Sequence, residues 1–131
     1  MKKRQKRQKR VRHPGRWLHK PTRMAIYLRD KNTCVYCACV IDSDRLSIDH
    51  LICYSHGGSN RANNLATCCK SCNSTRRDKT LRQWFAFLKT EKAYTDVQIE
   101  DIKKRIRSIR RNSSPMKMAR LRSLAKELHG L

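Results

Sequence analysis

Two Cys-x-x-Cys pairs constrain the fold of this chain more than any other feature of its sequence. The pairs are Cys34/Cys37 and Cys69/Cys72. Each pair brings two sulfurs close together, and four thiolates that meet in space form the tetrahedral ligand set that zinc prefers. Four thiolates leave no open coordination position, so we expect a structural zinc rather than a catalytic one. The segment between the pairs must then fold as an insertion whose two ends are joined by the metal.

Three further cysteines leave the choice of ligands open. Cys39 and Cys68 each lie beside a pair, so Cys-x-Cys or Cys-Cys combinations are alternative ligand sets. Reduced or redox-active pairs are the other alternative. We favour the two matched spacings and predict that Cys53 is a small buried apolar side chain. The chain has seven cysteines and no predicted secretory signal, which favours metal ligation over a disulfide framework.

The charge of the chain predicts a polyanionic partner. It carries 32 Lys and Arg against 10 Asp and Glu, a formal net charge of +22. Neutralising phosphates and releasing their counterions would give affinity without sequence preference, so we expect nucleic acid as the partner. A ribosomal-type RNA binder is an open alternative. A membrane is disfavoured, because the basic segments lack large aromatic faces and no apolar stretch could span a bilayer. We therefore expect a cytoplasmic protein.

Composition and hydrophobic periodicity divide the chain into three parts. Residues 1–20 are predicted to be a disordered basic arm, because the first dozen hold eight Lys or Arg and almost nothing apolar. Residues 21–95 are predicted to form the core with the cysteine pairs, and 96–131 a pair of basic helices. Two short strands are expected within 39–52 and a helical turn at 65–66. The helices are expected at 21–31, 69–77, 80–89, 96–111 and 114–128.

A set of short motifs lies in the segment between the two cysteine pairs and just beyond its end. They are Asp49-His50, Gly57-Gly58, Asn63-Asn64 and Cys69-x-x-Cys72-Asn73. In this order, interleaved with the cysteine pairs, they resemble the HNH endonuclease family, and the short zinc-containing HNH proteins of bacteria and their phages look closest. The resemblance implies an α+β fold: a ββα-metal finger with a structural four-cysteine zinc, here extended by additional basic helices.

The resemblance also assigns roles to single residues. His50 takes the position of the general base, which suits a side chain that titrates near neutral pH. Asp49 and Asn73 take positions that hold a catalytic divalent ion, and their oxygens suit Mg²⁺ or Mn²⁺. Asn64 takes the position that orients the base and shapes the loop. Because neighbouring residues of a regular strand point to opposite faces, Asp49 and His50 can share a site only if the strand ends or bends there.

The expected substrate is double-stranded DNA, cut to leave 5′-phosphate and 3′-hydroxyl ends. Arg76, Arg77 and Lys79 are expected to contact phosphates beside the site, while the basic arm and the C-terminal helices clamp the duplex. His56 is predicted to be a solvated loop residue. A homodimer built on the C-terminal helices and a role with phage packaging proteins are further expectations. The competing reading is a non-catalytic zinc module that binds DNA or RNA.

Overall fold

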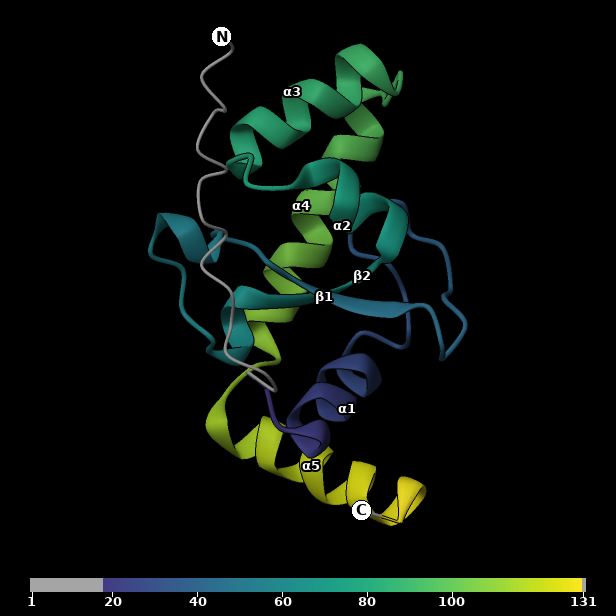
Figure 1. Cartoon of the computed structure of the whole chain (residues 1–131), viewed down its shortest axis with the longest axis vertical. Coiled ribbons are helices and arrows are strands. Elements are labelled where there is room, and N and C mark those ends of the chain that lie inside the picture. The colour runs from purple at the N-terminus through teal and green to yellow at the C-terminus, as the bar shows by residue number, and fades with distance from the viewer. Residues whose placement is uncertain (1–17, 131) are drawn as a thin grey trace, which may run out of the picture.

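The computed structural model describes residues 18–130, which form an α+β fold with one two-stranded antiparallel sheet. Figure 1 shows the sheet across the middle of the molecule, with helices on both sides of it. The predicted fold class is therefore confirmed. Most of the expected basic arm lies outside the described residues. The elements are α1 (Lys20–Arg29), β1 (Leu46–His50), η1 (Tyr54–His56), η2 (Ala62–Asn64), β2 (Leu65–Cys69), α2 (Lys70–Arg76), α3 (Leu81–Glu91), α4 (Asp96–Arg111) and α5 (Pro115–His129).

The sheet is made by β1 and β2, which pair from Leu46 opposite Cys69 to His50 opposite Leu65. Two of our expectations for this region are wrong. No second strand forms within 39–52, where only an isolated bridge joins Thr33 to Val40. The residues expected as a helical turn at 65–66 instead begin β2. The alternation of the short sequence Leu-Ala-Thr-Cys-Cys is too brief to separate strand from helix, and pairing with β1 decides it.

Local capping signals account for where the long helices begin. Thr80 and Gln83 form a capping box at the start of α3, and Thr95 and Gln98 form another at α4. At α5, the Ser114 hydroxyl accepts from the Lys117 backbone N–H, and Pro115 occupies the first turn. These side chains satisfy backbone N–H groups that have no partner within a helix. The expected bounds of α3, α4 and α5 are accordingly met within two residues at each end.

The two faces of the sheet carry separate hydrophobic clusters. Ala66 and Cys68 project into a larger cluster with the first cysteine pair, α3 and α4, which contributes Ile99, Ile102, Ile106 and Ile109. Leu65 belongs to a smaller cluster made by α1 and α5. In Figure 1, α4 passes behind the sheet while α1 and α5 lie below it. The division of the chain at 95/96 stays a prediction, and α4 packs in the same core as the cysteine pairs.

A buried ion pair at the end of α1 holds β2. Arg29 pairs with Asp30, whose Oδ2 accepts from the Thr67 backbone N–H at 2.9 Å. The Arg29 guanidinium also donates to the carbonyls of Ala62 and Leu65. These contacts fix the start of β2, and with it the pairing that places His50 at the end of β1.

We expect Ile102→Ala to lower the free energy of unfolding by about 2–5 kcal/mol, because it removes a fully buried side chain and leaves a cavity. Chemical denaturation of the zinc-loaded protein measures this change. The matched control is Val97→Ala in the same helix, which is 70% exposed and should change stability by less than about 0.5 kcal/mol. Equal effects of the two substitutions would contradict a core role for α4.

Candidate metal centre and catalytic strand

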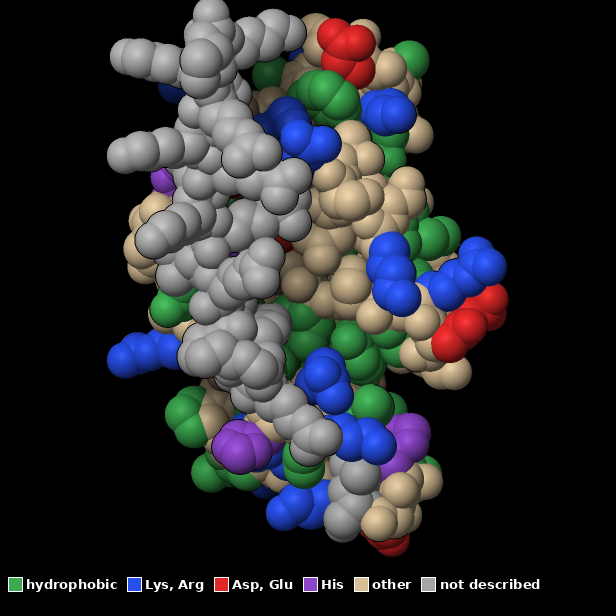
Figure 2. All heavy atoms as spheres, in the orientation of Figure 1, with side chains coloured by type: hydrophobic (Ala, Val, Ile, Leu, Met, Phe, Trp, Pro, Cys, Tyr) green, Lys and Arg blue, Asp and Glu red, His purple; other side chains and the backbone are tan. Residues whose placement is uncertain are grey.

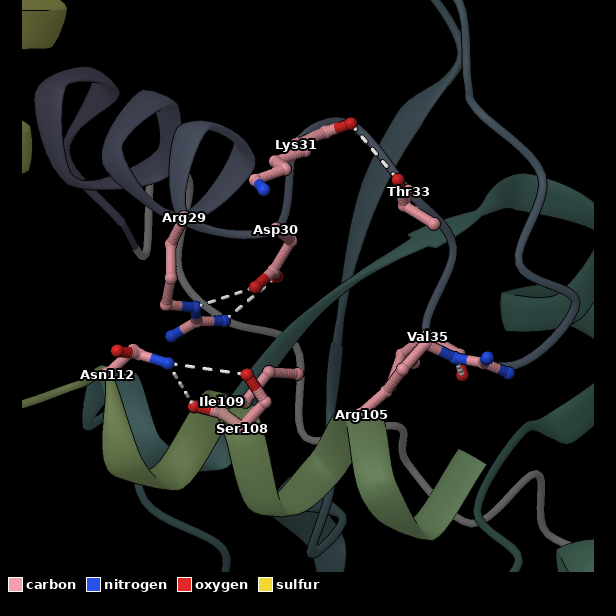
Figure 3. Close-up of a pocket in the computed structure, with 9 residues that line it drawn as sticks. All are labelled: Arg29, Asp30, Lys31, Thr33, Val35, Arg105, Ser108, Ile109 and Asn112. Atoms are coloured by element: carbon pink, nitrogen blue, oxygen red, sulfur yellow. Dashed lines mark hydrogen bonds and ion pairs between the residues drawn. The ribbon is translucent and has the colours of Figure 1, made fainter. Parts of the chain in front are cut away.

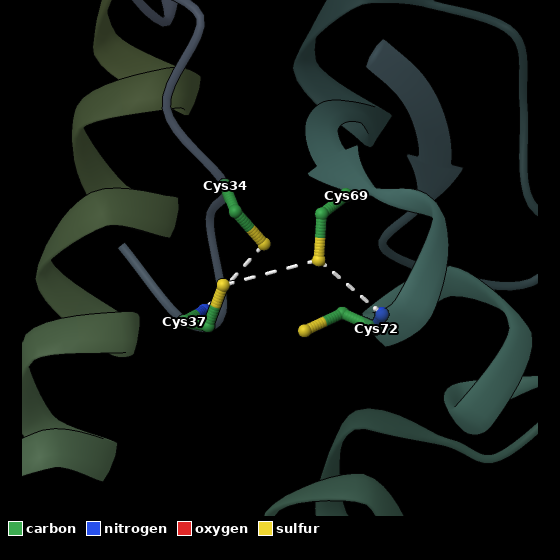
Figure 4. Close-up of side chains that lie close together, drawn as sticks. All are labelled: Cys34, Cys37, Cys69 and Cys72. Carbon is green, nitrogen blue, oxygen red and sulfur yellow. Dashed lines mark hydrogen bonds between the residues drawn. The ribbon is translucent and has the colours of Figure 1, made fainter. Parts of the chain in front are cut away.

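The four cysteines of the two pairs converge. Their sulfurs lie within 4.8 Å of one another, and no other such group of His, Cys, Asp or Glu occurs among residues 18–130. Figure 4 shows the sulfurs pointing toward a common centre, two from the loop after α1 and two from the β2–α2 junction. A tetrahedral zinc with Zn–S bonds of about 2.3 Å separates its sulfurs by about 3.8 Å. The 3.9 Å between Cys37 and Cys69 fits this geometry.

Backbone hydrogen bonds shape both pairs for a metal. The N–H of Cys37 points at Cys34 Sγ and the N–H of Cys72 at Cys69 Sγ, at 3.5 and 3.4 Å. Such bonds stabilise negative charge on sulfur. The pKa of Cys34 falls to about 4, first because the Cys72 side chain donates to its sulfur and against the effect of burial. The same shared contact raises the pKa of Cys72. These contacts favour negative charge on Cys34, as metal ligation requires.

The remaining cysteines occupy different environments. Cys39 is exposed, with its sulfur 3.1 Å from Cys37, and Cys68 is buried against Ser47. Burial raises the pKa of the Cys68 thiol, so this residue behaves as an apolar side chain. Cys53 is also buried, and burial raises the pKa of its thiol. Neither Cys39 nor Cys68 belongs to the converging group.

The predicted catalytic residues divide between the two faces of β1. Asp49 lies on the face that α2 covers, because its Oδ2 contacts Arg76 Nη1 at 2.5 Å. Asn73 lies on this side too, where its Nδ2 donates to Ser47 Oγ at 3.4 Å. His50 belongs to the other face, and its Nε2 is 2.8 Å from Asn60 Oδ1. The structure thus brings Asp49 and Asn73 to one side of the strand. It places His50 on the opposite side, as the last residue of the strand.

A buried network holds Asp49. Its Oδ2 accepts from the Tyr36 hydroxyl at 2.5 Å as well as from Arg76. Burial raises the pKa of Tyr36 well above its usual value, and the negative charge of Asp49 adds to the effect. Burial alone would lower the pKa of Arg76, but Tyr36 and Asp49 beside it raise it. The network therefore keeps Arg76 charged and Tyr36 protonated. Oδ1 of Asp49 accepts no hydrogen bond from residues 18–130.

Arg76 is not on the surface, which corrects our expectation that it contacts phosphates. Its exposed fraction is 0%, and its guanidinium also donates to the carbonyls of His50 and Leu51, each at 2.7 Å. Arg77 is exposed, as expected. Lys79 is half-buried. Its Nζ donates to the Thr75 carbonyl near the end of α2 and lies 4.7 Å from the centre of the Phe87 ring. The sequence of α2 gives no signal that the face carrying Arg76 is covered.

Asn64 clamps the loop that follows His50. Its Oδ1 accepts from the Ile52 N–H at 2.8 Å, and its Nδ2 donates to the carbonyls of Ile52 and Ser59. Gly58 completes the clamp, since a Cβ there would lie 1.7 Å from the Ile52 carbonyl oxygen. The Asn64 backbone carbonyl also accepts from the Leu51 N–H. These contacts hold the loop between His50 and β2, and the orienting role expected of Asn64 stays a prediction.

Several residues at this site were not singled out from the sequence. Asn60 contacts His50, and the Tyr54 ring lies 5.9 Å from the His50 ring. Tyr36 carries the hydroxyl that binds Asp49. The sequence offers a signal only for Tyr36, which lies inside a cysteine pair. The other residues lie in loops, whose side chains follow no periodic pattern. His56 is exposed, as expected, and its Nε2 contacts the Asp78 carbonyl at 2.8 Å.

A pocket of about 270 Å³ lies apart from these residues. Figure 3 shows it between the end of α1 and α4, with Arg29, Asp30 and Arg105 among its walls. Arg29 is committed to Asp30, and Arg105 donates to the carbonyls of Val35 and Tyr36. None of the predicted catalytic residues lines the pocket, and its two arginines are used in holding the fold.

Comparison with known protein families decides the relationship. Residues 34–85 match the family described as HNH endonuclease. The matched segment includes both cysteine pairs, the sheet and α2, and it is similar to the nuclease family whose motifs the sequence resembles. No curated protein matches the chain. Among residues 18–130, no helix has the length and apolar character needed to cross a membrane.

Removal of a metal ligand tests the cysteine centre. We expect Cys72→Ser to lose bound zinc and to lower the melting temperature by many degrees, because the two pairs would no longer be joined. Zinc content by elemental analysis and thermal unfolding measure the two effects. Cys39→Ser is the matched control and should keep one zinc per chain. Loss of zinc from the Cys39 variant, with retention in the Cys72 variant, would mean that the ligands are chosen differently.

The buried charge pair makes a second prediction. We expect Arg76→Met to destabilise the protein by about 3–5 kcal/mol, because Asp49 is left buried without its cation. Arg77→Met, next in the chain and exposed, should change stability by less than about 0.5 kcal/mol. Denaturant unfolding at saturating zinc compares the two. A surface role for Arg76 would instead leave both variants equally stable.

Proposed function

We propose that this chain is a metal-dependent endonuclease that hydrolyses DNA phosphodiester bonds, with His50 as the general base. One observation carries the proposal: within the segment that matches the HNH family, contacts fix both the backbone and the side chain of His50. Arg76 holds its backbone carbonyl at 2.7 Å, and Asn60 Oδ1 lies 2.8 Å from Nε2. A base must be held in one orientation to take a proton from an attacking water, so this fixation has a chemical purpose.

The contact with Asn60 favours one tautomer of His50. A carboxamide oxygen only accepts hydrogen bonds, so Nε2 carries the proton and donates to Asn60 Oδ1. In this tautomer the lone pair belongs to Nδ1, and we assign the role of general base to that nitrogen.

Asp49 and Asn73 are the residues that would hold a catalytic divalent ion. Asp49 uses Oδ2 for Tyr36 and Arg76, so Oδ1 is the oxygen offered to a metal. Asn73 uses Nδ2 for Ser47, so its amide oxygen remains as a ligand. Two oxygen ligands, with water and phosphate oxygens, suit Mg²⁺ or Mn²⁺. When bound, such an ion stabilises the negative charge that develops on the leaving 3′ oxygen. The donor set fits this group.

Because His50 and Asp49 belong to opposite faces of β1, we place the scissile phosphate across the end of the strand. His50 is the last residue of β1, and the loop clamped by Asn64 begins directly after it. One such site acts on one strand at a time, so a monomer would nick duplex DNA. Cytoplasmic location, a homodimer and a role in phage DNA packaging stay predictions from the sequence.

The second candidate function is a zinc-containing DNA- or RNA-binding module without catalysis. The ion pair of Asp49 with Arg76 is the observation that favours it, since a neutralised carboxylate attracts a cation less strongly. Against it stand the orientation of His50 and the loop clamp, which a binding module does not need. Divalent-metal-dependent cleavage separates the two functions.

The proposal predicts nicking of supercoiled plasmid in the presence of Mg²⁺ or Mn²⁺ and zinc-loaded protein. His50→Ala should reduce the rate by about 10²-fold or more, since it removes the general base, while DNA binding is retained. His56→Ala, in the following loop, is the matched control and should keep the wild-type rate. Absence of cleavage with any divalent ion, or equal cleavage by the His50 variant, would favour the binding module.

A further inference from the structure

Charge is unevenly distributed along α4. Its three acidic residues, Asp96, Glu100 and Asp101, all lie within its first six positions. Two of them are neutralised there, because Asp96 pairs with Lys89 and Glu100 with Lys103. The remaining positions carry only basic charge and end in Arg110 and Arg111. Both arginines are exposed, and neither pairs with a carboxylate of residues 18–130.

The start of α5 adds another cation to the same place. Lys117 Nζ donates to the Arg111 carbonyl at 3.2 Å and lies 3.4 Å from Asn112 Oδ1. We call Arg110, Arg111 and Lys117 the turn patch. Part of this charge complements the dipole of α4, but a helix end carries only about half a negative charge. Three exposed cations exceed that need, and their mutual repulsion has no counter-charge within residues 18–130.

The turn patch lies beside the loop that follows His50. Arg29 Nη1 bridges the two, donating to the Ala62 carbonyl at 2.8 Å and to Ser113 Oγ at 3.0 Å. Ala62 begins η2, two residues after the Asn60 that contacts His50. In Figure 1 the chain passes from α4 into α5 beneath the end of the sheet at which β1 stops and β2 begins. Arg61, which precedes η2, is exposed and adds a cation between the patch and the catalytic strand.

We propose that the turn patch is a second phosphate-binding surface, which holds duplex DNA on the flank of the site while the strand end engages the scissile phosphate. The identity of the ligand rests on the proposed function, and the surface lies outside the HNH segment at 34–85. Duplex DNA presents one negative charge per about 1.7 Å of its axis, so several phosphates face a cluster of this kind at once. Such contacts add affinity without sequence preference and set the position of the duplex.

Figure 2 shows that basic side chains also occur elsewhere on the molecule, so the test needs a control of equal charge. Arg45 and Lys70 provide it. Both are exposed, and they lie next to the pair Leu46–Cys69, at the opposite end of the sheet from His50. Replacing Arg110 and Arg111 by Gln, or Arg45 and Lys70 by Gln, removes two positive charges in each case. Melting temperature and zinc content establish that both double variants are folded.

Binding is measured by fluorescence anisotropy of a labelled duplex over a range of salt concentrations, without divalent ions, in the His50→Ala background. Each lost phosphate contact reduces the slope of log K against log salt by about 0.9. We expect the Arg110/Arg111 variant to reduce the slope by about 1–2 and the affinity by about tenfold or more. The Arg45/Lys70 variant should change the slope by less than half as much. Equal losses in the two variants, or an unchanged slope in the first, would overturn the proposal.

Nicking by proteins that retain His50 separates this proposal from the proposed function. The Arg110/Arg111 variant should raise the DNA concentration that gives half the maximal rate and leave the maximal rate unchanged. A fall in the maximal rate without a change in that concentration would overturn the second surface. If the wild-type chain does not nick at all, the endonuclease proposal fails while the difference in salt slopes still decides whether the turn patch binds DNA.

Discussion

The convergence of four cysteine sulfurs is the contact on which the rest of the site depends. It joins the loop after α1 to the β2–α2 junction, two segments that lie far apart in the chain. The first pair carries Tyr36 and the second is followed by Asn73 and Arg76. Closing the cysteine centre therefore also delivers the groups that surround Asp49. The cysteine centre and the surroundings of Asp49 are linked by sequence adjacency, because Tyr36, Asn73 and Arg76 lie only one to four residues from one of the four cysteines.

Burial of the Asp49 charge costs stability, but the contacts that offset this cost fix the end of β1 in position. Removing two charges from water is costly, and the cost is offset only when each remaining donor and acceptor finds a partner. Arg76 meets that condition with Asp49, Tyr36 and backbone carbonyls. The result is a strand end whose side chain and backbone are both fixed. Asn64 and Gly58 fix the loop on its far side, so His50 is held between two rigid supports.

The C-terminal helices extend this small domain in two directions. α4 completes the hydrophobic cluster around the cysteine centre, and α5 packs with α1 against the other face of the sheet. Each helix buries an apolar stripe and leaves most of its basic residues in solvent, which is the division expected of long cationic side chains. The same two helices thus contribute to the hydrophobic clusters and to the basic surface, and the turn between them meets the loop that follows His50 through Arg29.

The sequence by itself determined the cysteine centre, the HNH relationship and the long helices. Ligand spacing, motif order and capping residues such as Thr95 and Ser114 are local features, readable over a few positions. The tertiary structure decided the partner of β1, because a five-residue strand such as β2 acquires its conformation from pairing. It also decided that Arg76 is buried and that Asn60 meets His50. Burial and loop contacts depend on which distant segments pack together, and no local pattern of residues encodes that choice.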